Sequence, residues 1–128
     1  MNGQARTTYP KSDLRARTKA FALRIIRLSC SLPRTTVAQV LGKQVLRSGT
    51  SVGAHYREAR RARSTLEFVS KVEGGLQELD ETAYWLELLE DANLCDRAVA
   101  HELRGEAEEL TSIFVSSAKT AKKICVTK

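Results

Sequence analysis

Residues 64–89, STLEFVSKVEGGLQELDETAYWLELL, give the clearest indication of how this chain folds. The apolar positions of this stretch recur at alternating spacings of three and four residues over the whole length, which is the period of one face of an α-helix. Ser64 and Glu67 have the spacing of a capping box, in which side chains accept hydrogen bonds from free backbone N–H groups at the helix start. We therefore expect one continuous helix over 64–92. Its inner stripe consists of Val69, Val72, Leu76, Leu79, Ala83 and Leu86.

Two helices are predicted before this stretch. Asp13 suits the N-cap of a helix over 13–32, and Pro33 ends that helix because proline lacks the backbone N–H and clashes with the preceding turn. A Thr-x-x-Gln capping box at Thr36 predicts the start of a second helix over 36–61. The inner stripes are Leu14, Thr18, Phe21, Ile25, Leu28 and Leu32 in the first helix, and Val37, Leu41, Val45, Ser48, Val52, Tyr56 and Ala59 in the second.

One helix is predicted after the stretch. Asn93 is expected to end the third helix, and Asp96 to cap a fourth over 96–123. Residues 1–12 are interpreted as a flexible N-terminal arm and residues 13–125 as one domain. Four amphipathic helices with short connections predict an all-α fold, an antiparallel up-down-up-down four-helix bundle. The inner stripe of the fourth helix is Val99, Leu103, Leu110, Phe114, Ala121 and Ile124.

Glycines lie inside the second and third helices. A glycine costs about 1 kcal/mol relative to alanine in a helix interior, so its presence there calls for a reason. Gly49 and Gly53 are one turn apart and indicate the close approach of a neighbouring helix. Gly74 and Gly75 weaken the centre of the third helix. The apolar pattern keeps its phase across them, so we expect the helix to continue.

The 128-residue chain has the composition of a globular protein, with 42% hydrophobic and 28% charged residues. It contains no run of about eighteen apolar residues, and its first residues are polar rather than an apolar signal core. Cys30, Cys95 and Cys125 are far apart and lack the paired spacing of a zinc site or a redox motif. We therefore expect a cytoplasmic protein without a membrane segment, whose thiols are reduced and mostly buried.

No arrangement of residues predicts a catalytic or metal site. His55 and His101 fall on different helices, and His101 lacks a second histidine one turn on, so the pattern of zinc proteases is absent. The segment from Gly49 to Gly53 has neither the lysine nor the preceding strand of a phosphate loop. No Glu-x-x-His pair occurs, which argues against a di-iron bundle. We expect no enzymatic activity, no catalytic residues, no metal and no cofactor.

Charge is divided unevenly along the chain. Residues 1–63 contain fourteen Lys and Arg against Asp13 and Glu58, a net charge of +12, whereas residues 64–128 contain seven against thirteen acidic residues, a net charge of −6. The planar guanidinium group matches phosphate oxygens, so arginines on two neighbouring helices favour the backbone of RNA or DNA as a ligand. The predicted nucleic-acid-binding residues are Arg24, Arg27, Lys43, Arg47, Arg57, Arg60, Arg61 and Arg63.

An alternative interpretation gives the same arginines a structural role. The third helix is rich in carboxylates, which could pair with these arginines within one chain or between copies. In that case the protein is a scaffold or adaptor for a protein partner and binds no nucleic acid. The carboxylates concerned are Glu73, Glu78, Asp80, Glu81 and Glu87.

The third helix also has apolar residues on a second face. A helix of a four-helix monomer buries one stripe, so a second apolar face needs another partner, and self-association provides one. Tyr84, Trp85 and Leu88 are therefore the predicted oligomer interface. The alternative is that Trp85 packs beneath the connection to the fourth helix.

Three segments carry a resemblance to a known family. They are SGTSVGAHYREARRA at 48–62, FVSK at 68–71 and ELDETAYWLELL at 78–89. They resemble the bacterial four-helix bundle proteins related to the open reading frame within 23S rRNA intervening sequences. Relatives of that group include the accessory variability proteins of diversity-generating retroelements. The resemblance extends over about residues 13–123 and is specific in the second and third helices.

The resemblance implies a homopentameric barrel of four-helix protomers with a positively charged surface, which in some relatives binds nucleic acid and a reverse transcriptase partner. It implies no enzymatic activity. Ser51, Arg57, Glu58 and Glu78 match the family pattern and are interpreted as packing and inter-helix polar contacts. The sequence departs from that pattern at His55, where asparagine is usual.

Overall fold

The computed structural model describes residues 13–127, and this part of the chain is helical apart from short connections. The four helices are α1, Leu14–Cys30; α2, Thr36–Arg60; α3, Thr65–Asp91; and α4, Arg97–Thr127. The prediction of an all-α fold with four helices is confirmed. The first three helices begin and end within two residues of the predicted positions, and α4 runs past its predicted end at 123. None of the helices in this described part is long and apolar enough to cross a membrane. The predicted N-terminal arm, 1–12, lies outside the described residues.

Side chains cap three of the helices where the sequence indicates. Asp13 accepts a hydrogen bond from a backbone N–H in the first turn of α1 at 3.2 Å. Ser64 Oγ accepts from the backbone N–H of Glu67 at 3.0 Å, and Asp96 Oδ1 accepts from that of Ala98 at 2.8 Å. These bonds satisfy backbone donors that have no partner within the helix, and so they fix where each helix begins.

α2 begins at Thr36 as predicted, but its N-cap differs from the predicted capping box by one residue. Thr35, not Thr36, is the N-cap, and its hydroxyl accepts from the backbone N–H of Ala38 at 3.2 Å. The Gln39 amide donates instead to the carbonyl of Pro33 at 2.9 Å. Both threonines are suitable N-caps, so the packing of the first turn against the core decides between them.

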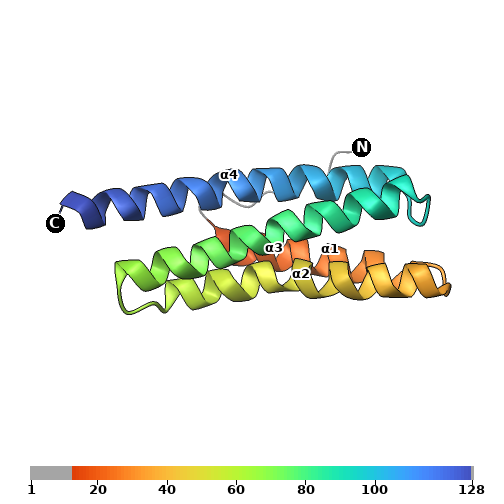
Figure 1. Ribbon diagram of the computed structural model, residues 1–128, viewed down its shortest axis with the longest axis horizontal. Helices are drawn as coiled ribbons and strands as arrows, with labels where there is room; N and C mark the ends of the chain where they lie inside the picture. Colours follow the sequence, from red (N-terminus) through yellow and green to blue (C-terminus); the bar gives the residue numbers. More distant parts are fainter. Residues whose placement is uncertain (1–12, 128) are drawn as a thin grey trace.

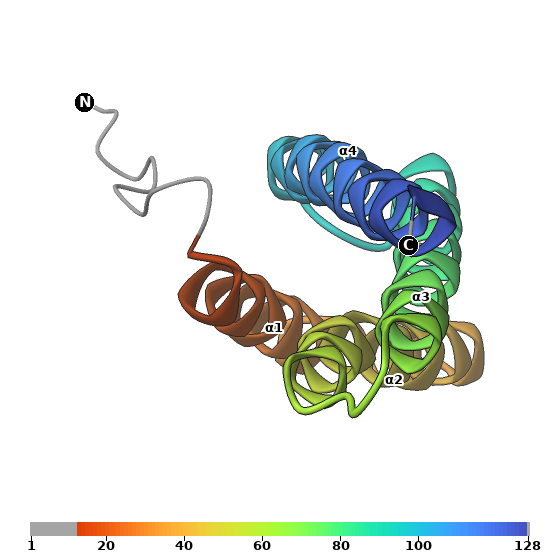
Figure 2. The same cartoon turned by 90° about the vertical axis from the view of Figure 1, so that its left-hand side faces the viewer.

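The four helices pack as neighbours in a ring, in which α1 contacts α2 and α4, and α3 contacts α2 and α4. Figure 1 shows that each helix runs back along the one before it, and Figure 2 shows the ring from one end. α1 has 17 residues and α4 has 31, and the contact between these two helices is the least extensive of the four. The short α1 therefore lines only part of α4.

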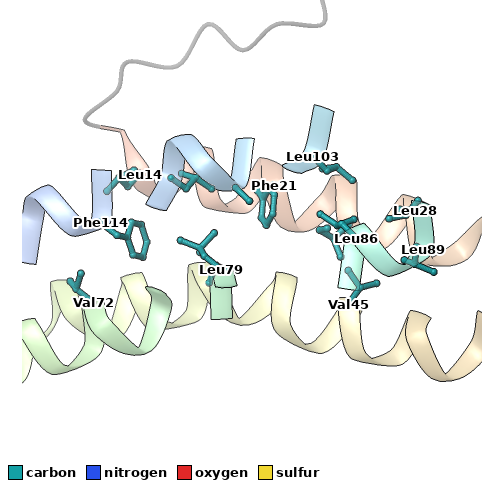
Figure 3. Close-up of a cluster of buried hydrophobic side chains, with 14 of the residues drawn as sticks. Leu14, Phe21, Leu28, Val45, Val72, Leu79, Leu86, Leu89, Leu103 and Phe114 are labelled. Atoms are coloured by element: carbon teal, nitrogen blue, oxygen red, sulfur yellow. The ribbon is translucent and has the colours of Figure 1, made fainter. Parts of the chain in front are cut away.

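The core is one continuous cluster of apolar side chains from all four helices. Figure 3 shows them pointing toward one another between the ribbons. Full burial of a side chain of this size contributes about 1.5–3 kcal/mol, so the stripes predicted from the sequence supply the main stabilisation. The largest fully buried apolar side chains are Phe21, Ile25, Val45, Val52, Val72, Leu79, Leu86, Leu89, Leu103, Leu110 and Phe114.

Glycines allow α1 and α2 to approach closely, as predicted for Gly49 and Gly53. A Cβ atom at Gly49 would lie 2.8 Å from Cγ1 of Ile25, and one at Gly53 would lie 3.1 Å from Oγ1 of Thr18. Both separations are shorter than van der Waals contact, so no other residue fits without movement. Gly75 has the same role between α3 and α4, where Phe114 fills the space of its missing side chain.

Three positions of the predicted inner stripes are wrong. Val37, Val99 and Ile124 are 60%, 40% and 49% exposed. Ala38 and Ala100, each one residue further along, are fully buried in the first turns of α2 and α4. A small side chain at these positions lets the neighbouring helices approach, and the larger valines then face outward.

The two cysteines whose side chains the structure describes differ from the prediction that most thiols are buried, and Cys125 lies outside the residues whose side chains are described. Cys30 is exposed at the end of α1, and Cys95 is half-buried in the connection before α4. Cys30 lies two residues from Leu28 and from Leu32, so it falls off the buried stripe that those leucines continue.

Candidate nucleic-acid interface

Four of the predicted basic residues gather where α2 ends and the chain turns into α3. We call Arg57, Arg60, Arg61 and Arg63 the α2 arginine cluster. All four residues are exposed. Within residues 13–124, no carboxylate forms an ion pair with any of their side chains, whereas other arginines of the bundle are paired. Four guanidinium groups are therefore available at one end of the bundle.

The local sequence explains why the cluster is stable without carboxylate partners. Arg57 and Arg60 lie in the last turn of α2, and Arg61 is its C-cap. The free carbonyl groups at a helix C-terminus carry partial negative charge, which favours cations there by about 0.3–1 kcal/mol. Arg63 is positioned by its main chain, since its backbone N–H donates to Oε1 of Glu67 at 3.0 Å.

Arg47 is not available in the same way, because carboxylates of α3 hold it. Its Nη2 donates to Oε1 of Glu81, and its Nη1 lies 3.4 Å from Oε1 of Glu78. Gln44, one turn earlier in α2, accepts a further hydrogen bond at 3.3 Å. The hydrogen bond to Glu81 is the main cause that raises the pKa of Arg47. This part of the predicted basic surface is thus committed to the α2–α3 contact.

The remaining predicted residues lie apart from the cluster. Nη2 of Arg24 is 3.8 Å from Oε1 of Glu102 on α4. Arg27 and Lys43 are exposed and have no ion pair with a described carboxylate, but they lie toward the connection between α1 and α2. Fourteen residues separate Lys43 from Arg57, a distance of roughly 21 Å along a helix. The structure therefore brings four of the eight residues together and leaves the other four elsewhere.

Two lysines outside the predicted set lie at the same end of the bundle as the cluster. Lys119 and Lys123 are exposed near the end of α4, on either side of Lys122, which pairs with Glu73 at 2.8 Å. Figure 1 shows the end of α4 on the same side of the molecule as the connection between α2 and α3. These lysines are far from the arginine cluster in sequence, and only the packing of the helices brings the two groups to one end of the bundle. A local sequence pattern therefore could not indicate them.

A buried arginine on α1 was also missed. Arg17 is only 4% exposed, and its guanidinium donates to the carboxylates of Glu106 and Glu109 on α4. The hydrogen bond to Glu106 is the main cause that raises the pKa of Arg17, against the opposing effect of burial. The burial of Arg17 could have been predicted from its position, because Arg17 falls between Leu14 and Phe21 on the inner stripe.

His55 lies in a polar seam between α2 and α3. Its Nδ1 is 3.6 Å from Oε1 of Glu58, and its Nε2 is 3.6 Å from Oε2 of Glu78, beyond hydrogen-bonding distance. The ring packs on Gly74, where a Cβ atom would lie 3.0 Å from the imidazole. Nearby, Lys71 pairs with Glu58 at 3.4 Å. In the described part of the chain, no three His, Cys, Asp or Glu side chains are placed to hold a metal ion.

The predicted oligomer interface is partly exposed. Tyr84 is 53% exposed, and its ring centre lies 5.2 Å from that of Trp85. Trp85 packs against the core with part of its surface, and its Nε1 donates to Oε1 of Glu81 at 3.4 Å. Leu88 is half-buried. Tyr84 is therefore the member of this group with most surface to offer to a second copy.

The fold and the charges define a basic four-helix protein whose arginine cluster, at one end, pairs with no carboxylate of residues 13–124. A family model described as 23S rRNA-intervening sequence protein matches residues 11–116, and the chain belongs to this family. The resemblance found in the sequence is thereby confirmed. The chain is also similar to a solved structure, a protein of unknown function from the S23 ribosomal protein family of Bacteroides thetaiotaomicron. The two share 36% sequence identity with a TM-score of 0.78, over 83% of this chain and 98% of that one. A comparison with curated proteins gave no match.

Proposed function

We propose that this chain is a non-enzymatic, cytoplasmic, up-down-up-down bundle that assembles into a homo-oligomer and binds the phosphate backbone of RNA or DNA through the α2 arginine cluster. The exposure of Arg57, Arg60, Arg61 and Arg63, with no carboxylate paired to them in residues 13–124, is the observation that carries this proposal. The family name refers to an intervening sequence of 23S rRNA, so a structured RNA is the first ligand to test.

The chemistry of the cluster favours the nucleic-acid backbone over the bases. A guanidinium group donates two parallel hydrogen bonds to phosphate oxygens, and it needs no sequence information to do so. No tyrosine, tryptophan or phenylalanine is among residues 57–63, so stacking of unpaired bases has little support at this end of α2. Binding without sequence preference is the expected mode.

Self-association is proposed on the apolar surface of the protomer. Tyr84 and Leu66 on α3, with Val40 on α2, are more than half exposed. Exposed apolar groups of this size favour association because contact with a second copy removes them from water. A homopentamer is proposed from the resemblance to the barrel-forming relatives.

A second candidate function rests on the ion pairs of the other basic residues. Arg47 pairs with Glu78 and Glu81, and Arg24 lies near Glu102, so carboxylates of this chain do engage predicted ligand-binding residues. If carboxylates of a neighbouring copy engage the α2 arginine cluster in the same way, the protein is a scaffold or adaptor for a protein partner. Asp80 and Glu87, exposed on α3, are available for such pairs.

Titration of a labelled structured RNA and a labelled DNA duplex with the full chain distinguishes nucleic-acid binding from the scaffold function. The first function predicts binding at about 50 mM salt that weakens roughly 100-fold at about 200 mM, as expected when four phosphates are neutralised. Absence of binding at the lower salt concentration would contradict it and favour the scaffold. A steep loss of affinity in Arg57→Ala/Arg60→Ala, with an unchanged oligomer, supports nucleic-acid binding.

The chain offers a control with the same change in charge. Arg34 follows α1, and Arg97 begins α4, so both lie at the end of the bundle opposite to the cluster. The variant Arg34→Ala/Arg97→Ala also removes two positive charges. Equal losses of affinity in the two double variants would show that net charge alone, and not the cluster, attracts the nucleic acid.

A further inference from the structure

One end of the bundle has a face that α1 does not reach. Arg17 pairs with Glu109, and Arg24 lies near Glu102, so α1 and α4 run in opposite directions. The start of α1 therefore lies at about the level of Ile113 on α4. α4 continues beyond this level, and Figure 1 shows it extending past the start of α1.

α2 also continues past the start of α1. A Cβ atom at Gly53 would lie 3.1 Å from Oγ1 of Thr18, so this side of α2 faces α1. Arg60 follows Gly53 by two turns and falls on the same side of the helix. Two turns span about 10 Å, whereas only about 6 Å of helix separates Thr18 from Leu14, the first residue of α1. Arg60 therefore borders the space beyond the start of α1.

Two adjoining hollows of about 300 and 570 Å³ lie along this continuation of α4. They share Phe68, Ala121 and Ile124, and together they form what we call the α4 groove. No residue of α1 lines either hollow. The groove thus occupies the place where α1 would continue if it began earlier, and a helix in that place would lie beside both α2 and α4.

The lining of the groove suits the packing of a helix. Ile113, Ser117 and Ile124 recur on one face of α4. Ile113 and Phe68 are half-buried against the core, and their remaining surface is apolar. Ser117 and Ala121 are small, so a neighbouring helix can approach α4 closely at these positions. The length of the groove along α4, roughly 18 Å, corresponds to about three turns of helix.

Cations border this apolar lining. Arg63 is the one charged residue among the described residues that line the groove, and none of them is acidic. Arg60 lies on the α2 side, and Lys123 follows the lining residue Thr120 by one turn on α4. Within residues 13–124, no carboxylate pairs with Arg60, Arg63 or Lys123. An occupant with carboxylates beside an apolar stripe complements both properties of the groove.

We propose that the α4 groove binds an acidic amphipathic helix of a partner protein. Apolar side chains of this helix pack on Phe68 and Ile113, and its carboxylates pair with Arg60, Arg63 and Lys123. This is the mode in which an amphipathic helix lays its apolar face into a groove, with charges fixing its orientation.

The apolar lining favours a protein helix over nucleic acid in this groove. A phosphate backbone pairs with exposed arginines, but it leaves an apolar surface uncovered. Leucine or phenylalanine side chains of a helix remove that surface from water. Arg60 and Arg63 also belong to the α2 arginine cluster, so the helix and an RNA backbone would compete for them. The groove binds the helix whether or not the cluster also binds RNA.

Methyl NMR of the full chain, labelled at isoleucine, tests the proposal with internal controls. The probe is a synthetic peptide of about sixteen residues, built of glutamate and alanine with leucines along one face of the helix. The peptide is expected to shift the methyl signals of Ile113 and Ile124. The signals of Ile25 in the core and Ile26 on the outer side of α1 should stay in place. An unchanged Ile113 signal at about 1 mM peptide would overturn the proposal.

Fluorescence anisotropy of the labelled peptide tests the role of charge. Arg60→Ala/Lys123→Ala should weaken binding by about three- to ten-fold, because two exposed ion pairs are lost. Arg34→Ala/Arg97→Ala removes the same charge at the opposite end of the bundle and should leave the affinity unchanged. Equal losses in the two double variants would overturn the proposal, since net charge alone would then attract the peptide.

A groove-filling variant tests the apolar contact. Ser117→Trp should weaken binding of the peptide by about ten-fold, because the indole occupies the place of its leucines. Ser70→Trp, on the exposed side of α3, is the matched control and should bind as the parent does. The Ile25 methyl signal shows whether each variant keeps the native core. A folded Ser117→Trp variant with the affinity of the parent would contradict docking in the groove.

Two other occupants would give different results. If a second copy of this chain fills the groove, the peptide will displace it, and sedimentation velocity will show the oligomer dissociating. If the groove belongs to a nucleic-acid site, a structured RNA will shift the Ile113 and Ile124 signals and the acidic peptide will not. Either result would overturn the proposal.

Discussion

The guanidinium of Arg17 on α1 donates from Nε and Nη2 to the carboxylate of Glu106 on α4, at 2.8 and 3.0 Å, in a site that leaves Arg17 only 4% exposed. This two-point contact joins the two helices that share the least contact in the bundle. It compensates a charge that would otherwise be buried at high cost. Its consequences for stability can be measured.

Arg17→Ala should lower the free energy of unfolding by about 2–4 kcal/mol, because it leaves Glu106 half-enclosed without its partner. The double replacement Arg17→Met/Glu106→Leu should recover most of that loss, since apolar groups of similar volume replace the pair. Urea unfolding followed by circular dichroism measures both values. A double variant as unstable as Arg17→Ala would contradict this account, because the loss would then not come from the unpaired carboxylate of Glu106.

Gly49→Ala should destabilise the bundle by about 1–3 kcal/mol, because its methyl group would lie 2.8 Å from Cγ1 of the buried Ile25. Gly105→Ala is the matched control. A Cβ atom there has no neighbouring atom within 4 Å, so the gain in helix propensity should stabilise the protein by up to about 1 kcal/mol. Thermal unfolding of the two variants should move in opposite directions, and a stabilised Gly49→Ala would refute the close contact of α1 and α2.

Tyr84→Ala should weaken self-association more than it weakens folding, because the side chain is 53% exposed in the protomer. Trp85→Ala should reduce both, since Trp85 also packs against the core. Sedimentation velocity at several protein concentrations measures the association, and urea unfolding measures the stability. An unchanged distribution of species for Tyr84→Ala would remove this residue from the interface.

Cys95 should react with a thiol reagent more slowly than Cys30 at a pH of about 8.5, near the ordinary pKa of a thiol. Burial is the main cause that raises the pKa of Cys95, with the charges of Glu90 and Asp96 adding to it, and Cys30 is exposed. The folded state therefore gains stability from Cys95 that is complete below the pKa of the unfolded chain and is lost as pH rises through the folded value. Mass spectrometry of the alkylated peptides follows both residues, and faster modification of Cys95 would contradict this assignment.

Local signals in the sequence were sufficient for the fold. The spacing of three and four residues placed the seams of all four helices, because burial of one stripe decides how an amphipathic helix packs. At the start of α2 the predictions were wrong by one residue. Ala38 is buried instead of Val37, and Thr35 is the N-cap instead of Thr36, because both residues of each pair fit the sequence pattern. In each case the contact with another helix determines which of the two residues takes the position, and the neighbouring sequence does not predict that contact.

The candidate site was less predictable because it depends on pairs of residues far apart in sequence. Arg47 is held by carboxylates 31 and 34 residues away, so its residue type suggests a ligand-binding arginine that the fold then neutralises. Arg57 and Arg60 have the same residue type, but no carboxylate of the described residues pairs with them. Only the register of α2 against α3 separates the two cases.

The slope of log Kobs against log salt concentration for structured RNA reports how many phosphates the α2 arginine cluster neutralises. Neutralisation of four phosphates by the α2 arginine cluster predicts a slope of about −3 to −4, and Arg57→Ala/Arg60→Ala should make it shallower by about 1–2 units. Arg34→Ala/Arg97→Ala should leave it unchanged. An equal slope for the parent and for the cluster variant would contradict the claim that these arginines meet the RNA backbone.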